Sequence, residues 1–183
     1  MRTATFVRTG LRVSGFDADL DRLHERAREL YPDGFPAEET TTLDKLYAHV
    51  SYAFVAALRA EVAAKLGVEP QIMPLDLFQA YGCGPIALHD DRFRFPGVYF
   101  VIVVVHSGRL GVVDRTCRAA RHEAGEILLL DPYRKHGLVP EGRTAREHPY
   151  ERTHSLVTDA ADQFVFLDFD VKRPLLRGQF RGV

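Results

Sequence analysis

The sequence contains few cysteines and no long apolar run. Its two cysteines, Cys83 and Cys117, belong to no CxxC or Cys/His pattern, so neither a disulfide framework nor a structural zinc site is predicted. The longest purely apolar run, Val98–Val105, has eight residues, whereas a membrane-spanning helix needs roughly 20. The N-terminal residues also lack the apolar stretch of a secretory signal. We therefore expect a cytoplasmic protein that does not enter a membrane.

The sequence also lacks an excess of charge of either sign. Its 24 Lys and Arg residues nearly balance 25 Asp and Glu residues, which gives a formal net charge of −1. No global field would draw such a chain to nucleic acid or to an anionic membrane, so neither is expected as a partner. The GxxxxGK[ST], GxGxxG and GxSxG patterns are absent. Nucleotide-binding and α/β-hydrolase functions therefore have no support from local motifs.

The pattern of the chain changes near Pro70. Residues 1–70 show mainly helical periodicity, and residues 71–183 show short apolar runs separated by turn residues. The total length of 183 residues is that of one ordinary domain. We therefore expect a single domain over residues 1–183, in which N-terminal strands and helices cover a β-structured core at 71–183.

The N-terminal part predicts two helices after a short β segment. Residues 3–13 are typical of one or two short strands. An amphipathic helix is predicted from Asp17, placed as its N-cap, with apolar residues at spacings of three and four. A longer helix is predicted from about Thr42 to Leu66, with Gly67 as its C-terminal stop. We expect both helices to pack on one side of a sheet.

The C-terminal part carries the signals of β-structure. Short runs rich in Val, Ile, Leu and Phe are mostly separated by clusters of Gly, Pro, Asp or Ser. These runs are LDLFQAY, IALHD, GVYFVIVVV, LGVVD, EILLL, HGLV and QFVFLDFDV. About seven strands after two helices fit a barrel or sandwich better than alternating β-α-β units. Because Val98–Val105 is apolar throughout, we expect it to be a central strand covered on both faces.

Three side chains in this part form a candidate metal site. His89 and Asp91 are two residues apart, so on a strand they would project from the same face. A second histidine, His136, lies where a strand resumes after a turn at Pro132. Two imidazoles and one carboxylate on neighbouring strands can occupy one face of an octahedral ion and leave its other positions open. This facial triad is typical of non-haem Fe(II) oxygenases.

The order of elements resembles the Fe(II)- and 2-oxoglutarate-dependent dioxygenases with a double-stranded β-helix core. The resemblance extends over about Leu75–Val171, and the smaller, prolyl-hydroxylase-like members are most similar. It rests on a strand with Tyr81 before a Gly-rich turn, the HxD strand, the long apolar strand, and a Gly-Glu-Ile-Leu-Leu-Leu run before the second histidine. It implies an α+β, mainly-β fold with a jelly-roll or cupin-like core and two N-terminal packing helices. It also implies that His89, Asp91 and His136 hold catalytic Fe(II).

The resemblance further implies 2-oxoglutarate as co-substrate. An arginine near the start of the last core strand usually binds its far carboxylate, because a guanidinium can grip both oxygens. Here Gln163 stands at about that place. We choose Arg152 as the anchor, because it is closest to a further strand-like segment, and expect Tyr81 to hydrogen-bond the co-substrate. The other candidates are Arg143, Arg146, Arg109 and Arg115. A co-substrate other than 2-oxoglutarate is the remaining alternative.

Other polar residues near the candidate site are assigned no role. Asp90 should point to the opposite face from Asp91, although a one-residue shift of register would exchange the two. Asp168 and Asp170 alternate with apolar residues and are expected on the polar side of an ordinary strand. The remaining histidines are expected to be surface residues: His24, His49, His106, His122, His148 and His154.

These patterns predict an Fe(II)- and 2-oxoglutarate-dependent oxygenase that uses O₂ to hydroxylate or otherwise oxidise a small molecule, an amino acid or a peptide. One alternative is a cupin-like metal- or ligand-binding module without oxygenase activity. Cupins usually supply a His-x-His pair with a Glu and a further His, so the HxD pattern favours the oxygenase. A second alternative, left open by Gln163, is a degenerate barrel that serves as an interaction domain. The sequence determines neither the substrate nor the oligomeric state.

Overall fold

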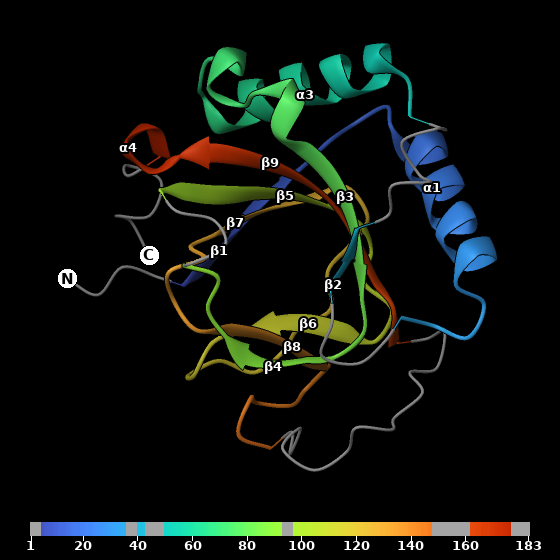
Figure 1. Ribbon diagram of the computed structural model, residues 1–183, viewed down its shortest axis with the longest axis vertical. Helices are drawn as coiled ribbons and strands as arrows, with labels where there is room; N and C mark the ends of the chain where they lie inside the picture. The colour runs from blue at the N-terminus through green and yellow to red at the C-terminus, as the bar shows by residue number, and fades with distance from the viewer. Residues whose placement is uncertain (1–4, 36–39, 43–49, 93–96, 148–161, 177–183) are drawn as a thin grey trace.

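The computed structural model describes residues 5–35, 40–42, 50–92, 97–147 and 162–176 (Figure 1). The strands are β1 (Phe6–Arg12), β2 (Thr40–Thr42), β3 (Phe78–Cys83), β4 (Ile86–His89), β5 (Val98–His106), β6 (Leu110–Val113), β7 (Glu126–Leu130), β8 (His136–Pro140) and β9 (Phe164–Lys172). The helices are α1 (Asp17–Leu30), α3 (Tyr52–Leu66) and α4 (Arg173–Leu176), with 3₁₀ turns η1 (Pro70–Ile72) and η2 (Leu75–Leu77). None of the helices in these ranges combines the length and the apolar character that crossing a bilayer requires.

The strands form two antiparallel sheets. The larger has the order β1-β7-β5-β9-β3-β2, and the smaller has the order β4-β8-β6. Figure 1 shows the smaller sheet across from the larger one, with α1 and α3 on the outer side of the larger sheet. The predicted fold is confirmed: the chain is mainly β, with a double-stranded β-helix core and two N-terminal packing helices.

The core lies on both sides of the larger sheet. In β5, Val101 and Val103 belong to the apolar cluster under the helices, whereas Phe100 and Ile102 belong to the cluster between the sheets. Each side chain of this size contributes about 1.5–3 kcal/mol when it is fully buried. Burial on both faces explains why Val98–Val105 is apolar throughout, and it confirms the prediction of a central strand.

The helix α1 begins at Asp17, one residue earlier than an N-cap at Asp17 would place it. Phe16 is the N-cap and its side chain makes no capping hydrogen bond. Asp17 instead supplies a negative charge in the first turn, where it interacts favourably with the positive end of the helix dipole. The amphipathic pattern is confirmed, because Leu20, Leu23 and Ala27 are buried.

The helix α3 begins at Tyr52 rather than near Thr42. The hydroxyl of Ser51 caps it by accepting a 3.1 Å hydrogen bond from the backbone N–H of Phe54. The predicted start is wrong because Thr40–Thr42 forms β2, which pairs with Tyr81–Cys83 of β3. Residues 43–49 lie outside the described part. The predicted end is confirmed, because Gly67 adopts φ +66, a conformation that favours glycine.

Two histidines predicted at the surface stack on each other instead. The rings of His24 on α1 and His106 at the end of β5 have centroids 3.7 Å apart and planes at 12°. Burial, together with the positive charge of His24, Arg121 and Arg28, lowers the pKa of His106 to about 4. The stacked rings therefore join α1 to the larger sheet, and a proton added to His106 would be unfavourable in this contact.

The stacked pair predicts a loss of stability on mild acidification. Between pH 7 and pH 5 the unfolded chain protonates His106 near its ordinary pKa of 6.5, whereas the folded chain does not. The unfolded state then binds more protons, so the free energy of unfolding should fall by about 1–2 kcal/mol more in the wild type than in His106→Gln. Urea unfolding of both proteins at pH 7 and pH 5 measures this difference.

The wild type must be compared with His106→Gln because Asp170 changes the free energy of unfolding in the opposite direction as the pH falls. Burial raises its pKa to about 6, which favours the folded state as the pH falls, equally in both proteins. Equal losses in the wild type and in His106→Gln would show that the stacked ring takes up a proton in the folded state at its ordinary pKa.

His122 is a third histidine for which the surface prediction is wrong. It is 2% exposed, and its Nδ1 lies 3.2 Å from Oε2 of Glu126. Its Nε2 accepts a 3.3 Å hydrogen bond from the backbone N–H of Val112. Glu126 also forms an ion pair with Arg8, so this histidine ties β6 to β7 and β1. The i, i+4 pairing with a glutamate is the one sequence signal that could have indicated it.

Candidate metal centre

Two of the predicted ligands face each other across a strand pair. The antiparallel register of β4 and β8 places His89 directly opposite His136. Their imidazole rings have centroids 4.4 Å apart. Side chains at directly opposite positions project from the same face of a sheet. The pairing therefore brings the two imidazoles to one place, although the residues are far apart in the sequence.

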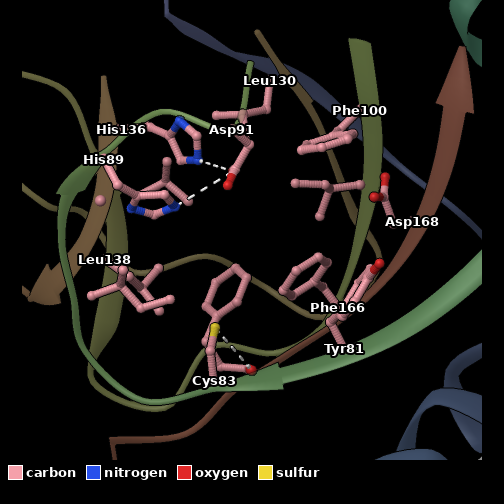
Figure 2. A pocket seen from close by; sticks show the side chains of 15 residues that line it. Tyr81, Cys83, His89, Asp91, Phe100, Leu130, His136, Leu138, Phe166 and Asp168 are labelled. Atoms are coloured by element: carbon pink, nitrogen blue, oxygen red, sulfur yellow. Dashed lines mark hydrogen bonds and ion pairs between the residues drawn. The ribbon is translucent and has the colours of Figure 1, made fainter. Parts of the chain in front are cut away.

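Asp91 joins them from outside the strand. The strand β4 ends at His89, and the backbone N–H of Asp91 donates a 2.8 Å hydrogen bond to the carbonyl oxygen of Pro132. This bond turns the carboxylate toward the histidines (Figure 2). Its Oδ2 lies 3.5 Å from Nε2 of His89 and 3.3 Å from Nε2 of His136. The carboxylate selected by the i, i+2 spacing therefore lies beside both histidines, and the turn at Pro132 sets its position.

The other ring nitrogens orient the imidazoles. Nδ1 of His89 lies 2.9 Å from the carbonyl oxygen of Ala87, and Nδ1 of His136 lies 2.9 Å from that of Arg134. A carbonyl can only accept, so Nδ1 carries a proton in both rings. Nε2 is then the nitrogen left to bind a ligand, and each Nδ1 contact fixes the ring as outer partners of metal-bound histidines do.

The electrostatics of the group favour a cation at its centre. Burial works to raise the pKa of Asp91, but hydrogen bonds and charge from both histidines outweigh it and hold the pKa far below its ordinary value. Burial works to lower the pKa of His89, and Asp91 reverses this, so the pKa is raised. The carboxylate thus attracts positive charge to the space between the three side chains. A divalent cation bound there can replace the protons that the two imidazoles would otherwise share with the Asp91 carboxylate.

The geometry passes a simple test for a metal site. One donor atom from each residue lies within 4.8 Å of the others, and this is the one such group among the described residues. Ligands that bind a first-row transition metal at about 2.1 Å and at right angles lie about 3 Å apart. The observed separations of 3.3 Å and 3.5 Å are close to that value. Two imidazoles and one carboxylate are donors suited to iron, nickel or cobalt, and they leave the opposite face open.

The three side chains lie on the wall of a pocket between the two sheets (Figure 2). Its volume is about 150 Å³. Most of the wall is apolar: Ile86, Phe100, Ile102, Val112, Leu130, Leu138, Phe164 and Phe166. Cys83 also lines it, but burial raises the pKa of this thiol to about 12, so it is not a nucleophile. The pocket therefore combines one polar corner with walls suited to hydrocarbon.

Of the described residues predicted to bind 2-oxoglutarate, the structure brings only one to the pocket. Tyr81 lines the pocket, and its hydroxyl donates a hydrogen bond to Oε1 of Gln79. Arg152 lies outside the described residues. The other proposed anchors do not line the pocket: Arg143, Arg146 and Arg115 are exposed, and Arg109 pairs with Asp162. Gln163 is fully buried and donates to the carbonyl of Tyr31 instead of lining the pocket. No lysine or arginine in the described ranges lines it.

Asp168 is the pocket residue that the sequence prediction placed wrongly. It was expected on the polar side of an ordinary strand, but it is 4% exposed and lines the pocket. The residues Phe164, Phe166 and Asp168 share the inner face of β9, while Leu167 and Phe169 pack under the helices. A strand with apolar residues at both alternations is buried on both faces. That pattern was the available signal that Asp168 would be buried.

Comparison with solved structures shows the same fold at low sequence identity. EvdO2 from Micromonospora carbonacea var. aurantiaca is 13% identical, with a TM-score of 0.52 over 93% of this chain and 88% of that chain. AviO1 from Streptomyces viridochromogenes Tue57 is 11% identical, with a TM-score of 0.50 over 94% and 91%. HygX from Streptomyces hygroscopicus is 13% identical, with a TM-score of 0.50 over 93% and 83%.

Two of these proteins have been solved with small molecules. The structure of HygX contains nickel and 2-oxoglutarate, and a second structure of EvdO2 contains 2-oxoglutarate. At these identities the similarity establishes the fold of the present chain and no more. No protein-family model and no curated protein sequence matches the chain.

Proposed function

We propose that this protein is an Fe(II)- and 2-oxoglutarate-dependent oxygenase in which His89, Asp91 and His136 hold the iron. The observation that carries the proposal is the convergence of two Nε2 atoms and one carboxylate oxygen at the corner of a largely apolar pocket. The fold, shared with proteins solved with 2-oxoglutarate, supports it. The substrate would be a small molecule, an amino acid or a short peptide segment.

The protein residues have distinct tasks in this proposal. The carboxylate of Asp91 would offset part of the metal's charge, and the carbonyls of Ala87 and Arg134 would keep both imidazoles aimed at it. Bound Fe(II) and 2-oxoglutarate would together use O₂ to oxidise the substrate, with 2-oxoglutarate leaving as succinate and CO₂. The apolar walls would exclude water and hold a hydrocarbon part of the substrate near the open side of the metal.

The contacts to 2-oxoglutarate are the less complete part of the proposal. The open face of the triad suits the keto acid end of 2-oxoglutarate. Tyr81 is proposed to hydrogen-bond the co-substrate, for which its hydroxyl proton must turn away from Oε1 of Gln79. For the far carboxylate, the described walls supply no basic side chain. Arg152 therefore remains our proposal for the anchor.

The test is an anaerobic titration of the purified full-length chain. Fe(II) followed by 2-oxoglutarate should produce a weak visible absorption band, and admission of air should convert 2-oxoglutarate to succinate. Both signals should be lost in His89→Ala and kept in His106→Gln, which removes a histidine outside the site. Iron binding without any response to 2-oxoglutarate would favour the cupin-like module. Absence of metal binding would overturn the proposal and leave the degenerate barrel.

A further inference from the structure

One carboxyl group on the pocket wall has no task in the proposed chemistry. Asp168 extends from β9 on the side of the pocket opposite His89 and His136 (Figure 2). It is 4% exposed, and its Oδ1 has no hydrogen-bond partner among the described residues. A buried acceptor left without a partner costs about 1–3 kcal/mol. The side chain lines a cavity beside the candidate metal centre, so a ligand group that enters the cavity can reach this carboxyl.

The surroundings of Asp168 leave its charge without compensation. Burial raises its pKa well above the ordinary range, and the negative charge of Asp170 on the same strand raises it further. The backbone N–H of Phe169 works in the opposite direction but does not reverse the shift. No described lysine or arginine lines the pocket, so a cationic group on a ligand would be the charge that favours the ionised form of this carboxyl.

The place of Asp168 in the fold is also informative, because a residue of the opposite charge is expected nearby. The resemblance to 2-oxoglutarate-dependent enzymes leads one to expect a basic residue near the start of β9. The inward residues there are Phe164, Phe166 and Asp168. A dicarboxylate extending from the metal toward β9 would therefore meet two aromatic rings and an acid.

We propose that Asp168 binds the protonated amino group of the substrate, so that the pocket selects a cationic amine with an apolar stem. The proposal rests on the proposed function only in taking this pocket as the substrate site. An ammonium group donates three hydrogen bonds and, in a dry site, also gains Coulomb energy from the carboxylate, whereas a hydroxyl offers one hydrogen bond. The apolar walls suit the stem, and a cavity of about 150 Å³ is of the size that holds a benzene molecule in another protein.

A series of matched probes tests the charge preference in the unmodified protein. n-Butylamine, 1-butanol and butyrate share a short apolar stem and differ in the charge of the end group. Ligand-induced chemical shifts should give n-butylamine a dissociation constant at least tenfold lower than that of 1-butanol, with no saturable binding of butyrate. The titrations are run on the full chain, once without metal and once with Fe(II) under nitrogen.

Two variants locate the binding group. Asp168→Asn keeps the shape of the side chain, removes its charge, and should weaken n-butylamine binding at least tenfold without weakening 1-butanol binding. Asp170→Asn is the matched control, because Asp170 is a carboxyl of the same strand that does not line the pocket. It should change n-butylamine binding by less than about threefold. The probe series in the wild type remains decisive even if Asp168→Asn folds poorly.

The outcomes separate this proposal from the function it rests on. Amine binding without metal that depends on Asp168 supports it, even if no iron chemistry is found. Amine binding only in the presence of Fe(II) would make the amine a metal ligand and overturn the proposal. Preference for butyrate, or equal binding of the amine and the alcohol, would also overturn it and would show that the wall does not select positive charge.

Discussion

Replacing Asp91 by alanine should weaken Fe(II) binding by about a thousandfold or more. The change removes the one anionic donor of the three-residue group and would leave the Nε2 atoms of His89 and His136 as its remaining donors. Loss of outer partners that merely orient a ligand costs about 10–100-fold in metal affinity. Loss of a charged ligand should cost more, because both a bond and the offset of the metal's charge disappear. Equilibrium dialysis against Fe(II) under nitrogen measures the affinity.

The neighbouring carboxylate provides the control. Asp90 forms an ion pair with Arg92, 2.7 Å between Oδ1 and Nε, and is not part of the three-residue group. Asp90→Ala should therefore leave the affinity for Fe(II) within about threefold of the wild type. If instead Asp90→Ala abolished binding and Asp91→Ala retained it, the two residues would have exchanged roles, as a one-residue shift of register would cause.

Asp91 illustrates how far local pattern predicts this site. The i, i+2 spacing and the later histidine after a Pro-containing turn predicted the three residues that the structure brings together, although Asp91 lies beyond the end of β4. The distances between them depend on contacts that local pattern does not specify. They come from the β4–β8 register, which pairs His89 with His136, and from the hydrogen bond between Asp91 and the carbonyl of Pro132.

The two errors that matter most arise from tertiary structure. The helical stripe predicted from Thr42 carries no sign that Thr40–Thr42 would pair with the edge of β3, because a pairing partner is not a local property. Asp168 was assigned to a polar face because alternating Asp and apolar residues are typical of strands with one solvated side. Here the helices cover one face of β9 and the smaller sheet lies across from the other, so neither face is solvated.

A single methyl group on β8 should disturb both the fold and the metal centre. A Cβ added at Gly137 would lie 2.8 Å from the carbonyl oxygen of Ile86 and 3.2 Å from the carbonyl carbon of Ala87. These are backbone atoms of β4, so the strands must separate to admit it. We expect Gly137→Ala to lower the free energy of unfolding by about 2–4 kcal/mol, near or above the usual cost of overpacking. Urea unfolding of the metal-free protein measures this effect.

The same separation should change metal binding, because the spacing of β4 and β8 sets the distance between His89 and His136. The folded fraction of Gly137→Ala should bind Fe(II) about 10–100-fold more weakly, as when ligands are displaced but retained. Gly111→Ala is the matched control in the same sheet. Its Cβ would lie 2.4 Å from the carbonyl oxygen of Ala120, so it should destabilise the fold without moving either histidine. Equal Fe(II) affinities in the two variants would mean that the strand spacing does not determine the geometry of the metal centre.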